Sequence, residues 1–143
     1  LKQLLGEANE VWLASDWVDW TANLLPRSVN RIASEFGVDV IVFGTKEFQI
    51  DLDLRNFLTL SQDERVKHSI KVPDRISKVN NKIKVELDDN RFVDIPKLIC
   101  PDSYCPTLTP DGSLWTYDGA HLTQSGAHHL GQLLDIKMST PNQ

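Results

Sequence analysis

The chain has 143 residues, of which 41% are hydrophobic and 24% are charged, and its formal net charge is −5. This composition is typical of a soluble domain with a core of its own. Acidic and basic residues are mixed along the chain, so no basic stripe favours nucleic-acid binding. No apolar run approaches the roughly 18 residues of a membrane span, which argues against a membrane-spanning helix.

The first residues read as the end of a helix that is already under way. The chain begins Leu-Lys-Gln-Leu-Leu, without Met and without a recognisable signal peptide. We therefore expect it to be the C-terminal portion of a longer protein, with sequence missing on its N-terminal side.

A strand, a helix and a second strand are predicted next. Residues 10–15 contain the apolar run Val-Trp-Leu-Ala, which predicts a short buried strand with Trp12 in the core. Residues 38–43, Val-Asp-Val-Ile-Val-Phe, predict a second buried strand, and residues 21–36 between them repeat apolar side chains at helical spacing. Continuous apolar strands joined by a helix are typical of a parallel sheet covered on both faces. The predicted fold class is α/β, with an open, mostly parallel sheet.

The ends of this first helix can be placed from two residues. Pro26 is tolerated only in a first turn, so the helix is expected to begin near Leu24. Gly37 is a suitable residue for the C-terminal stop.

The middle of the chain predicts two helices after an irregular segment. Residues 45–60 are expected to be irregular. Ser61 and Glu64 have the spacing of a capping box, so a helix is expected to start there and to run to about Val72, before Pro73 interrupts it. Another helix is expected to follow the proline and to reach roughly Val85.

The last part of the chain predicts a short strand, a loop and a final helix. The strand covers residues 91–95, the loop residues 96–111 and the helix residues 123–134. We expect residues 1–136 to form a single domain and residues 137–143 to be a polar tail.

The two cysteines, Cys100 and Cys105, are separated by four residues, and each is followed by proline. This arrangement favours a small disulfide-closed loop and an oxidising compartment. The alternative is a pair of reduced, partly buried thiols in a cytoplasmic protein. Zinc would need two further ligands of matching spacing, and the sequence offers no such pair.

Asp118 and His121 lie three residues apart in a turn that contains glycine, just before the final helix. This is what a Ser-His-Asp hydrolase needs from its last loop, because the carboxylate can orient the imidazole from behind. The alternative is an aspartate that caps a turn beside an exposed histidine. His128 and His129 could suggest a metal site with His121, but no carboxylate completes one, so surface histidines and no metal are predicted.

In an open parallel sheet, ligands bind at the carboxyl ends of the strands. Asp16, Gly44 and the turn of residues 118–121 are expected to gather at that edge. Trp17 lies just past a strand end and Trp115 lies close to the turn, so both are candidates for lining a substrate cleft, with packing as the alternative for Trp115.

Three stretches resemble a known family. They are residues 11–17 (Val-Trp-Leu-Ala-Ser-Asp-Trp), residues 99–106 (Ile-Cys-Pro-Asp-Ser-Tyr-Cys-Pro) and residues 115–127 (Trp-Thr-Tyr-Asp-Gly-Ala-His-Leu-Thr-Gln-Ser-Gly-Ala). In this order they resemble the C-terminal half of an SGNH (GDSL-type) hydrolase domain. More narrowly, they resemble the SGNH domains linked to acyltransferase-3 membrane proteins that O-acetylate bacterial surface polysaccharides. The resemblance implies a flavodoxin-like sandwich whose N-terminal part precedes this chain.

The resemblance also implies roles. His121 would be the general base and Asp118 its orienting acid, while the nucleophilic serine would lie upstream, because no Gly-Asp-Ser block occurs here. The family's Gly-x-Asn-Asp block is replaced by Ser15-Asp16-Trp17, which lacks the oxyanion asparagine. No cofactor is implied.

The partners implied by the resemblance are a polysaccharide or lipopolysaccharide acceptor and an acyltransferase-3 membrane domain in the same or another chain, but no nucleic acid. The implied location is periplasmic or extracytoplasmic, tethered to the inner membrane through the missing region.

Two other interpretations stay open. In one, an SGNH-like fold has lost catalysis and only binds glycan or a partner. In the other, an unrelated flavodoxin-like domain carries a chance Asp-x-x-His, which predicts reduced cysteines and a His121 far from any strand edge.

Overall fold

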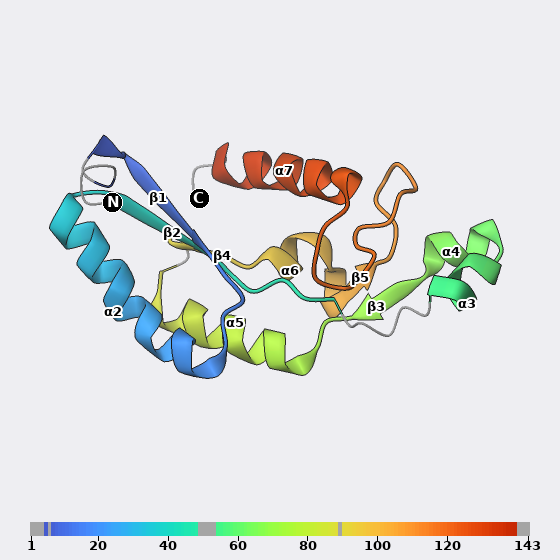
Figure 1. Ribbon diagram of the computed structural model, residues 1–143, viewed down its shortest axis with the longest axis horizontal. Helices are drawn as coiled ribbons and strands as arrows, with labels where there is room; N and C mark the ends of the chain where they lie inside the picture. The colour runs from blue at the N-terminus through green and yellow to red at the C-terminus, as the bar shows by residue number, and fades with distance from the viewer. Residues whose placement is uncertain (1–4, 6, 49–53, 89, 140–143) are drawn as a thin grey trace. The chain divides into compact units, whose positions relative to one another are not determined.

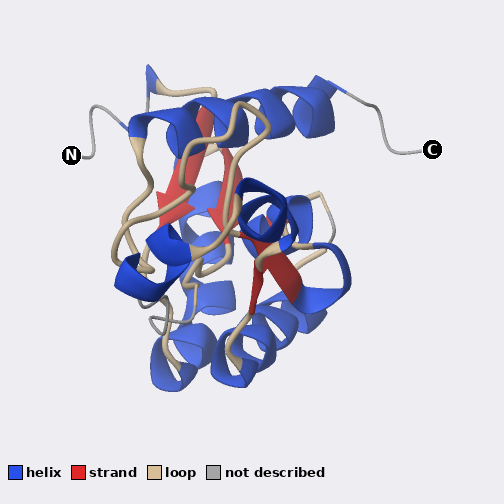
Figure 2. Cartoon of the chain, turned by 90° about the vertical axis from the view of Figure 1, so that its right-hand side faces the viewer, coloured by secondary structure: helices blue, strands red, loops and turns tan. Residues whose placement is uncertain are grey.

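The computed structural model describes residues 5, 7–48, 54–88 and 90–139. The chain divides into two compact units: Leu1–Thr45 with Asp74–Ile95, and Lys46–Pro73 with Pro96–Gln143. The first unit holds a three-stranded parallel sheet and the second a two-stranded antiparallel sheet. Helices and loops make up most of the rest (Figure 2).

The sheet of the first unit consists of β1 (Glu10–Ala14), β2 (Asp39–Phe43) and β4 (Phe92–Val93), in the order β1-β2-β4. Both strand pairs are parallel, with Glu10 opposite Asp39 at the start of the first pair. The predicted α/β class with a parallel sheet is therefore confirmed. The predicted strand over residues 91–95 is shorter than expected.

Two helices, α2 (Asp19–Phe36) and α5 (Asp74–Glu86), lie side by side in this unit (Figure 1). Their apolar faces bury the same cluster as the inward side chains of β2. Burying each such aliphatic side chain contributes about 1.5–3 kcal/mol, so this cluster is the main source of stability in the unit. Its most completely buried members are Ala22, Val29, Val40, Val42 and Ile83.

Helix α2 begins at Asp19, so the predicted start near Leu24 is wrong. The Thr21 hydroxyl accepts a hydrogen bond from the Val18 N–H (2.9 Å) and donates one to the Val18 carbonyl (2.8 Å). This local bonding fixes the helix start, and Pro26 consequently lies inside the helix. The predicted stop is confirmed, because Gly37 has φ 65° and its N–H donates to the Ala33 carbonyl.

Trp12 is 54% exposed, so the prediction that it lies in the core is wrong. Successive side chains of a strand point to opposite faces, and Val11 and Leu13 are the ones that pack against the core cluster. Trp12 instead contacts the ring of Phe43, with 5.1 Å between ring centroids. Along β1, half-buried side chains alternate with exposed ones, and Trp12 belongs to the exposed set.

A buried asparagine fastens the carboxyl end of β2 to α5. Asn80 is 1% exposed; its Oδ1 accepts from the Thr45 N–H (2.9 Å), and its Nδ2 donates to the Thr45 carbonyl (3.0 Å) and to Asp94 Oδ1 (3.1 Å). A Cβ on Gly44 would lie 2.9 Å from both Asn80 Nδ2 and Phe92 Cζ. The close approach therefore requires glycine at this position.

The second unit contains α3 (Leu54–Thr59), α4 (Gln62–Lys67), β3 (Ser69–Lys71), β5 (Tyr104–Pro106) and α7 (Gln124–Ser139). Helix α3 lies within residues 45–60, which were expected to be irregular; residues 49–53 of that segment lie outside the described residues. Helix α7 extends beyond residue 134, its predicted end. Within the described part of the chain, no helix combines the length and apolarity needed to cross a bilayer.

The start of α4 is as predicted, but its end is not. Ser61 and Glu64 form the capping box, with Ser61 N donating to Glu64 Oε2 over 2.8 Å. The helix ends at Lys67 instead of reaching Val72, because β3 pairs antiparallel with β5. Beside this pair His68 Nδ1 lies 2.6 Å from Thr107 Oγ1, so long-range pairing overrides helical propensity here.

The predicted loop over residues 96–111 also contains structure. It includes α6 (Ile95–Ile99), the 3-10 helix η1 (Pro101–Ser103) and β5. Cys100 and Cys105 form the predicted disulfide across η1, and both cysteines are buried. Asp102 and Ser103, inside the closed loop, have positive φ values of 53° and 66°.

Replacing both Cys100 and Cys105 by alanine is expected to lower the free energy of unfolding by about 2 kcal/mol, because a small closed loop restricts the unfolded chain. Urea denaturation of the double variant and of the oxidised protein measures this difference. The unmodified protein in dithiothreitol should lose a similar amount. An unfolding curve that dithiothreitol leaves unchanged would contradict the prediction.

Candidate active site

The turn that carries Asp118 and His121 is closed by short-range and longer-range bonds. Thr116 and Leu122 form an antiparallel bridge at its base, and the Thr116 hydroxyl accepts from the Gly119 N–H over 2.9 Å. Gly119 has φ 81°, a conformation that glycine adopts without strain. These bonds between nearby residues define the shape of the turn.

Asp118 and His121 are brought together within this turn. Asp118 Oδ1 accepts from the backbone N–H groups of Ala120 (2.9 Å) and His121 (2.8 Å). Its other oxygen, Oδ2, lies 2.6 Å from His121 Nδ1. One carboxylate thus binds the backbone with one oxygen and the imidazole with the other.

The same bonds determine which nitrogen of the imidazole is basic. The side chain of His121, and then the backbone N–H groups of His121 and Ala120, hold the pKa of Asp118 well below its usual range. An ionised carboxylate only accepts hydrogen bonds, so Nδ1 of His121 must carry the proton that it shares with Asp118. Nε2 then has the free lone pair, which is the arrangement a general base requires.

The basic nitrogen is open to an external partner. The His121 side chain is 75% exposed and that of Asp118 is 39% exposed. Among the described residues, no hydroxyl or thiol is hydrogen-bonded to His121 Nε2. The pair therefore lacks a nucleophile within the described part of the chain.

Lys46 and Phe48 also hold the turn, and sequence reasoning did not find them. Lys46 Nζ donates to the Ala120 carbonyl, and the Phe48 N–H donates to the Gly119 carbonyl over 2.8 Å. Burial lowers the pKa of Lys46, and the charge of Asp118 partly opposes that effect. These contacts join residues more than seventy positions apart, and no local pattern marks them.

Thr123 and Gly126, which follow the histidine, serve the fold. Thr123 caps α7, because its hydroxyl accepts from the Gly126 N–H (3.0 Å) and donates to the Leu114 carbonyl (2.5 Å). A Cβ on Gly126 would lie 2.5 Å from the carbonyl oxygen of Trp115, so the helix can approach that backbone only through glycine. Asp118 and His121 are the members of this block whose side chains face each other at the surface.

The two candidate cleft tryptophans are both engaged in packing. Trp17 is half-buried; its Nε1 donates to the Phe43 carbonyl (2.7 Å), and its backbone N–H donates to Thr45 Oγ1 (2.8 Å). Trp115 is 4% exposed. Trp17, Asp16 and Gly44 belong to the first unit, whereas Trp115 and the turn belong to the second. That these residues gather at one sheet edge stays a prediction.

The two histidines of α7 differ from each other. His128 is exposed, as predicted, but the prediction of a surface residue is wrong for His129, whose side chain is 18% exposed. The His129 ring packs against Trp115, and its Nε2 lies 3.4 Å from Asp111 Oδ2. Over the described residues, no group of three or more His, Cys, Asp or Glu side chains is placed to hold a metal ion.

Comparison with protein-family models, with curated proteins and with solved structures gives no match for this chain.

Proposed function

We propose that this chain is the C-terminal part of an SGNH-type O-acyltransferase or esterase domain that modifies a cell-envelope polysaccharide. The observation that supports the proposal is the 2.6 Å contact between Asp118 Oδ2 and His121 Nδ1, with Nε2 left open. In this proposal His121 is the general base and Asp118 orients it. The nucleophile is a serine that preceding sequence supplies.

The proposed reaction has two half-reactions. In the first, His121 Nε2 takes the proton of the serine hydroxyl while the serine oxygen attacks the acyl carbon of the donor. The bond to the donor oxygen breaks, and that oxygen receives the proton from the imidazolium. In the second, a sugar hydroxyl gives its proton to Nε2 and attacks the acyl-serine ester. The serine oxygen leaves and recovers the proton.

Transferase and esterase activities differ only in the acceptor. With water in place of the sugar hydroxyl, the same proton transfers hydrolyse the acyl-serine ester. The two outcomes therefore depend on acceptor binding and on exclusion of water, which the Asp118–His121 pair does not control. An acyltransferase-3 membrane domain, in the same or a partner chain, is proposed as the source of the acyl group.

The proposed location is periplasmic or extracytoplasmic, with a tether to the inner membrane in the preceding region. The Cys100–Cys105 disulfide supports an oxidising compartment, because such bonds form and persist there. The same disulfide argues against the unrelated flavodoxin-like domain, for which reduced cysteines were expected.

An inactive glycan- or partner-binding module is the second candidate. It is favoured by one observation: no nucleophilic side chain contacts His121 among the described residues. The upstream sequence of the parent gene separates the two candidates, because an active domain requires a Gly-Asp-Ser block there. Membrane helices in the same upstream sequence would favour the transferase over a free esterase.

We expect the 143-residue chain alone to show no hydrolysis of p-nitrophenyl acetate that depends on His121, because its serine is absent. Turnover is compared between the unmodified chain, the His121→Ala variant and the His128→Ala variant, which removes an exposed imidazole elsewhere. Equal background rates for all three are expected. A rate that only His121→Ala abolishes would place the nucleophile within this chain.

The longer domain provides the positive test. Once expressed with its upstream serine, it should transfer or release acetyl groups from an O-acetyl donor, and His121→Ala should abolish that activity. Retention of full activity by His121→Ala would contradict the proposed function.

A further inference from the structure

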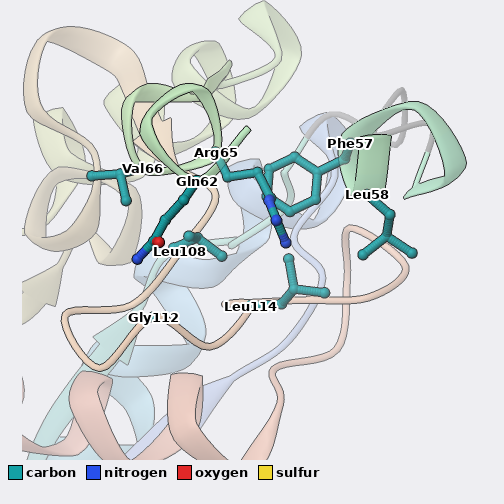
Figure 3. Close-up of a pocket in the computed structure, with 8 residues that line it drawn as sticks. All are labelled: Phe57, Leu58, Gln62, Arg65, Val66, Leu108, Gly112 and Leu114. Atoms are coloured by element: carbon teal, nitrogen blue, oxygen red, sulfur yellow. The ribbon is translucent and has the colours of Figure 1, made fainter. Parts of the chain in front are cut away.

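A pocket of about 370 Å³ lies in the second unit (Figure 3), and none of residues 118–121 lines it. Helices α3 and α4 form one wall, and the loop between β5 and the turn forms the other. Its volume is in the range of small-molecule sites, and its lining is mostly aliphatic and aromatic. The lining residues are Phe57, Leu58, Gln62, Arg65, Val66, Leu108, Gly112 and Leu114.

A cationic side chain projects into this pocket. Figure 3 shows the Arg65 guanidinium directed between Phe57 and Leu114. The Nε atom of Arg65 is buried and makes no hydrogen bond, and Arg65 has no ion pair among the described residues. The nearest carboxylate in sequence, Glu64, is engaged with Ser61, whose hydroxyl lies 2.6 Å away. A buried donor on a charged group without an acceptor is costly, so this guanidinium suits an anion that the described part of the chain does not provide.

The loop that forms the opposite wall is held in place before any ligand binds. Asp111 Oδ1 accepts from the Thr109 hydroxyl (2.6 Å) and the Ser113 N–H (3.0 Å), and Oδ2 accepts from the Ser125 hydroxyl of α7 (2.6 Å). These bonds, the one from Ser125 above all, hold the pKa of Asp111 well below its usual range. The wall is therefore formed in advance, which reduces the entropy lost on binding.

The apolar surface continues beyond this pocket. A second pocket, of about 460 Å³, shares Val66, Leu108 and Gly112 with the first and continues to Trp115 and Leu133. Among the described residues that line the two pockets, Arg65 is the only charged one. One cation at one end of an extended apolar surface matches a molecule with one anionic end and an apolar chain.

We propose that the second unit binds an anionic amphiphile here, with its carboxylate or phosphate group on Arg65 and its apolar chain along Val66 and Leu108. A guanidinium accepts either oxyanion through charge-assisted hydrogen bonds. This binding site is independent of the catalytic proposal and involves neither Asp118 nor His121.

The experiment titrates the 143-residue chain with decanoate, decyl phosphate and decanol by calorimetry, while NMR follows the Arg65 Nε–H resonance. Both anions are expected to bind and to move that resonance, whereas decanol should bind at least about tenfold more weakly. Binding of one anion alone supports the proposal and identifies the head group. The proposal fails if neither anion binds, or if decanol binds as tightly as the anions.

Two variants and a matched control test the residues. Arg65→Gln should weaken anion binding by about ten- to a hundredfold, since it removes the charged donor. Arg31→Gln makes the same change in charge on an exposed side chain of α2 and should leave binding unchanged. Leu58→Ser alters a lining residue that is 60% exposed, so it should leave the core intact. It should weaken the binding of decanoate more than the binding of butyrate. Unchanged binding by Arg65→Gln, with thermal unfolding like that of the parent, would overturn the proposal.

Discussion

Replacing Asp118 by asparagine is expected to lower acyl transfer by the longer domain by roughly three to four orders of magnitude, the loss known for this change in serine-protease triads. Asparagine has the shape of aspartate but no charge, and its amide can present N–H donors to Nδ1. The imidazole would then favour the tautomer that carries its proton on Nε2, which cannot act as a base. The value of kcat/KM measures the loss.

Asp111→Asn is the matched control for this experiment. Asp111 is another exposed carboxylate of the second unit with a lowered pKa, and it binds hydroxyls and a backbone N–H instead of the His121 imidazole. It is expected to leave kcat/KM within a few-fold of the parent. A loss of less than tenfold for Asp118→Asn would argue against Asp118 as the orienting acid.

The change of tautomer can be observed in the 143-residue chain itself. Nitrogen-15 chemical shifts of the imidazole distinguish a protonated Nδ1 from a protonated Nε2. The parent should show the proton on Nδ1, and Asp118→Asn should shift the population toward Nε2. This result is independent of the upstream serine, so it tests the pair separately from the proposed reaction.

The lowered pKa of Asp118 has a definite effect on pH dependence. The pKa of Asp118 is lower in the folded state than in the unfolded state. Its carboxylate therefore stabilises the folded state at pH values above its ordinary pKa, and this stabilisation is lost as the pH falls through the folded-state pKa. Across neutral pH Asp118 stays ionised. Its ability to orient His121 is therefore constant there.

Replacing Asn80 by alanine is expected to lower the free energy of unfolding by about 3–5 kcal/mol. The change removes the partners of the buried Thr45 N–H and carbonyl and the bond to Asp94, while it leaves a small cavity beside Gly44. An unsatisfied buried polar group costs about 1–3 kcal/mol, and two such groups result here. Chemical denaturation followed by circular dichroism measures the loss.

The neighbouring residue is the matched control for this substitution. Asn81 lies on the same helix but is exposed, so Asn81→Ala should change stability by less than about 0.5 kcal/mol. Similar stabilities for Asn80→Ala and Asn81→Ala would show that water or backbone movement replaces the lost hydrogen bonds.

Features that depend on neighbouring residues were predicted well from the sequence. Gly37 ends α2, and Ser61 with Glu64 starts α4, because caps use atoms only a few residues apart. The disulfide was also predicted, since the short spacing of Cys100 and Cys105 leaves little freedom. The parallel pairing of β1 and β2 follows from two apolar runs joined by a helix.

Features that depend on distant partners were predicted poorly. The strand after α4 forms because it pairs with β5. That partner lies more than thirty residues further along the chain, so the local sequence does not reveal the pairing. Trp12 was assigned to the core from its apolar neighbours, although only a knowledge of the covered sheet face could have shown that it is exposed.

The candidate site shows the same division. The Asp118–His121 contact spans three residues and was predicted, whereas the Lys46–Ala120 contact spans 74 positions and was not. The role proposed for Arg65 was not predicted either, because nothing in its local sequence indicates that its side chain lacks a counter-ion among the described residues.

The hydrogen bonds from the backbone to Asp118 Oδ1 fix the position of its carboxylate relative to His121. Both backbone donors to Oδ1 lie within three residues of the aspartate, so bonds inside the turn align the two side chains, while Lys46 and Phe48 hold the turn from outside. Small motions elsewhere in the protein would leave the contact between Asp118 Oδ2 and His121 Nδ1 intact. They would change the distance from His121 Nε2 to an incoming hydroxyl. If the longer domain has the proposed activity, its heat inactivation should reflect an increase in that distance, while His121 stays oriented by Asp118.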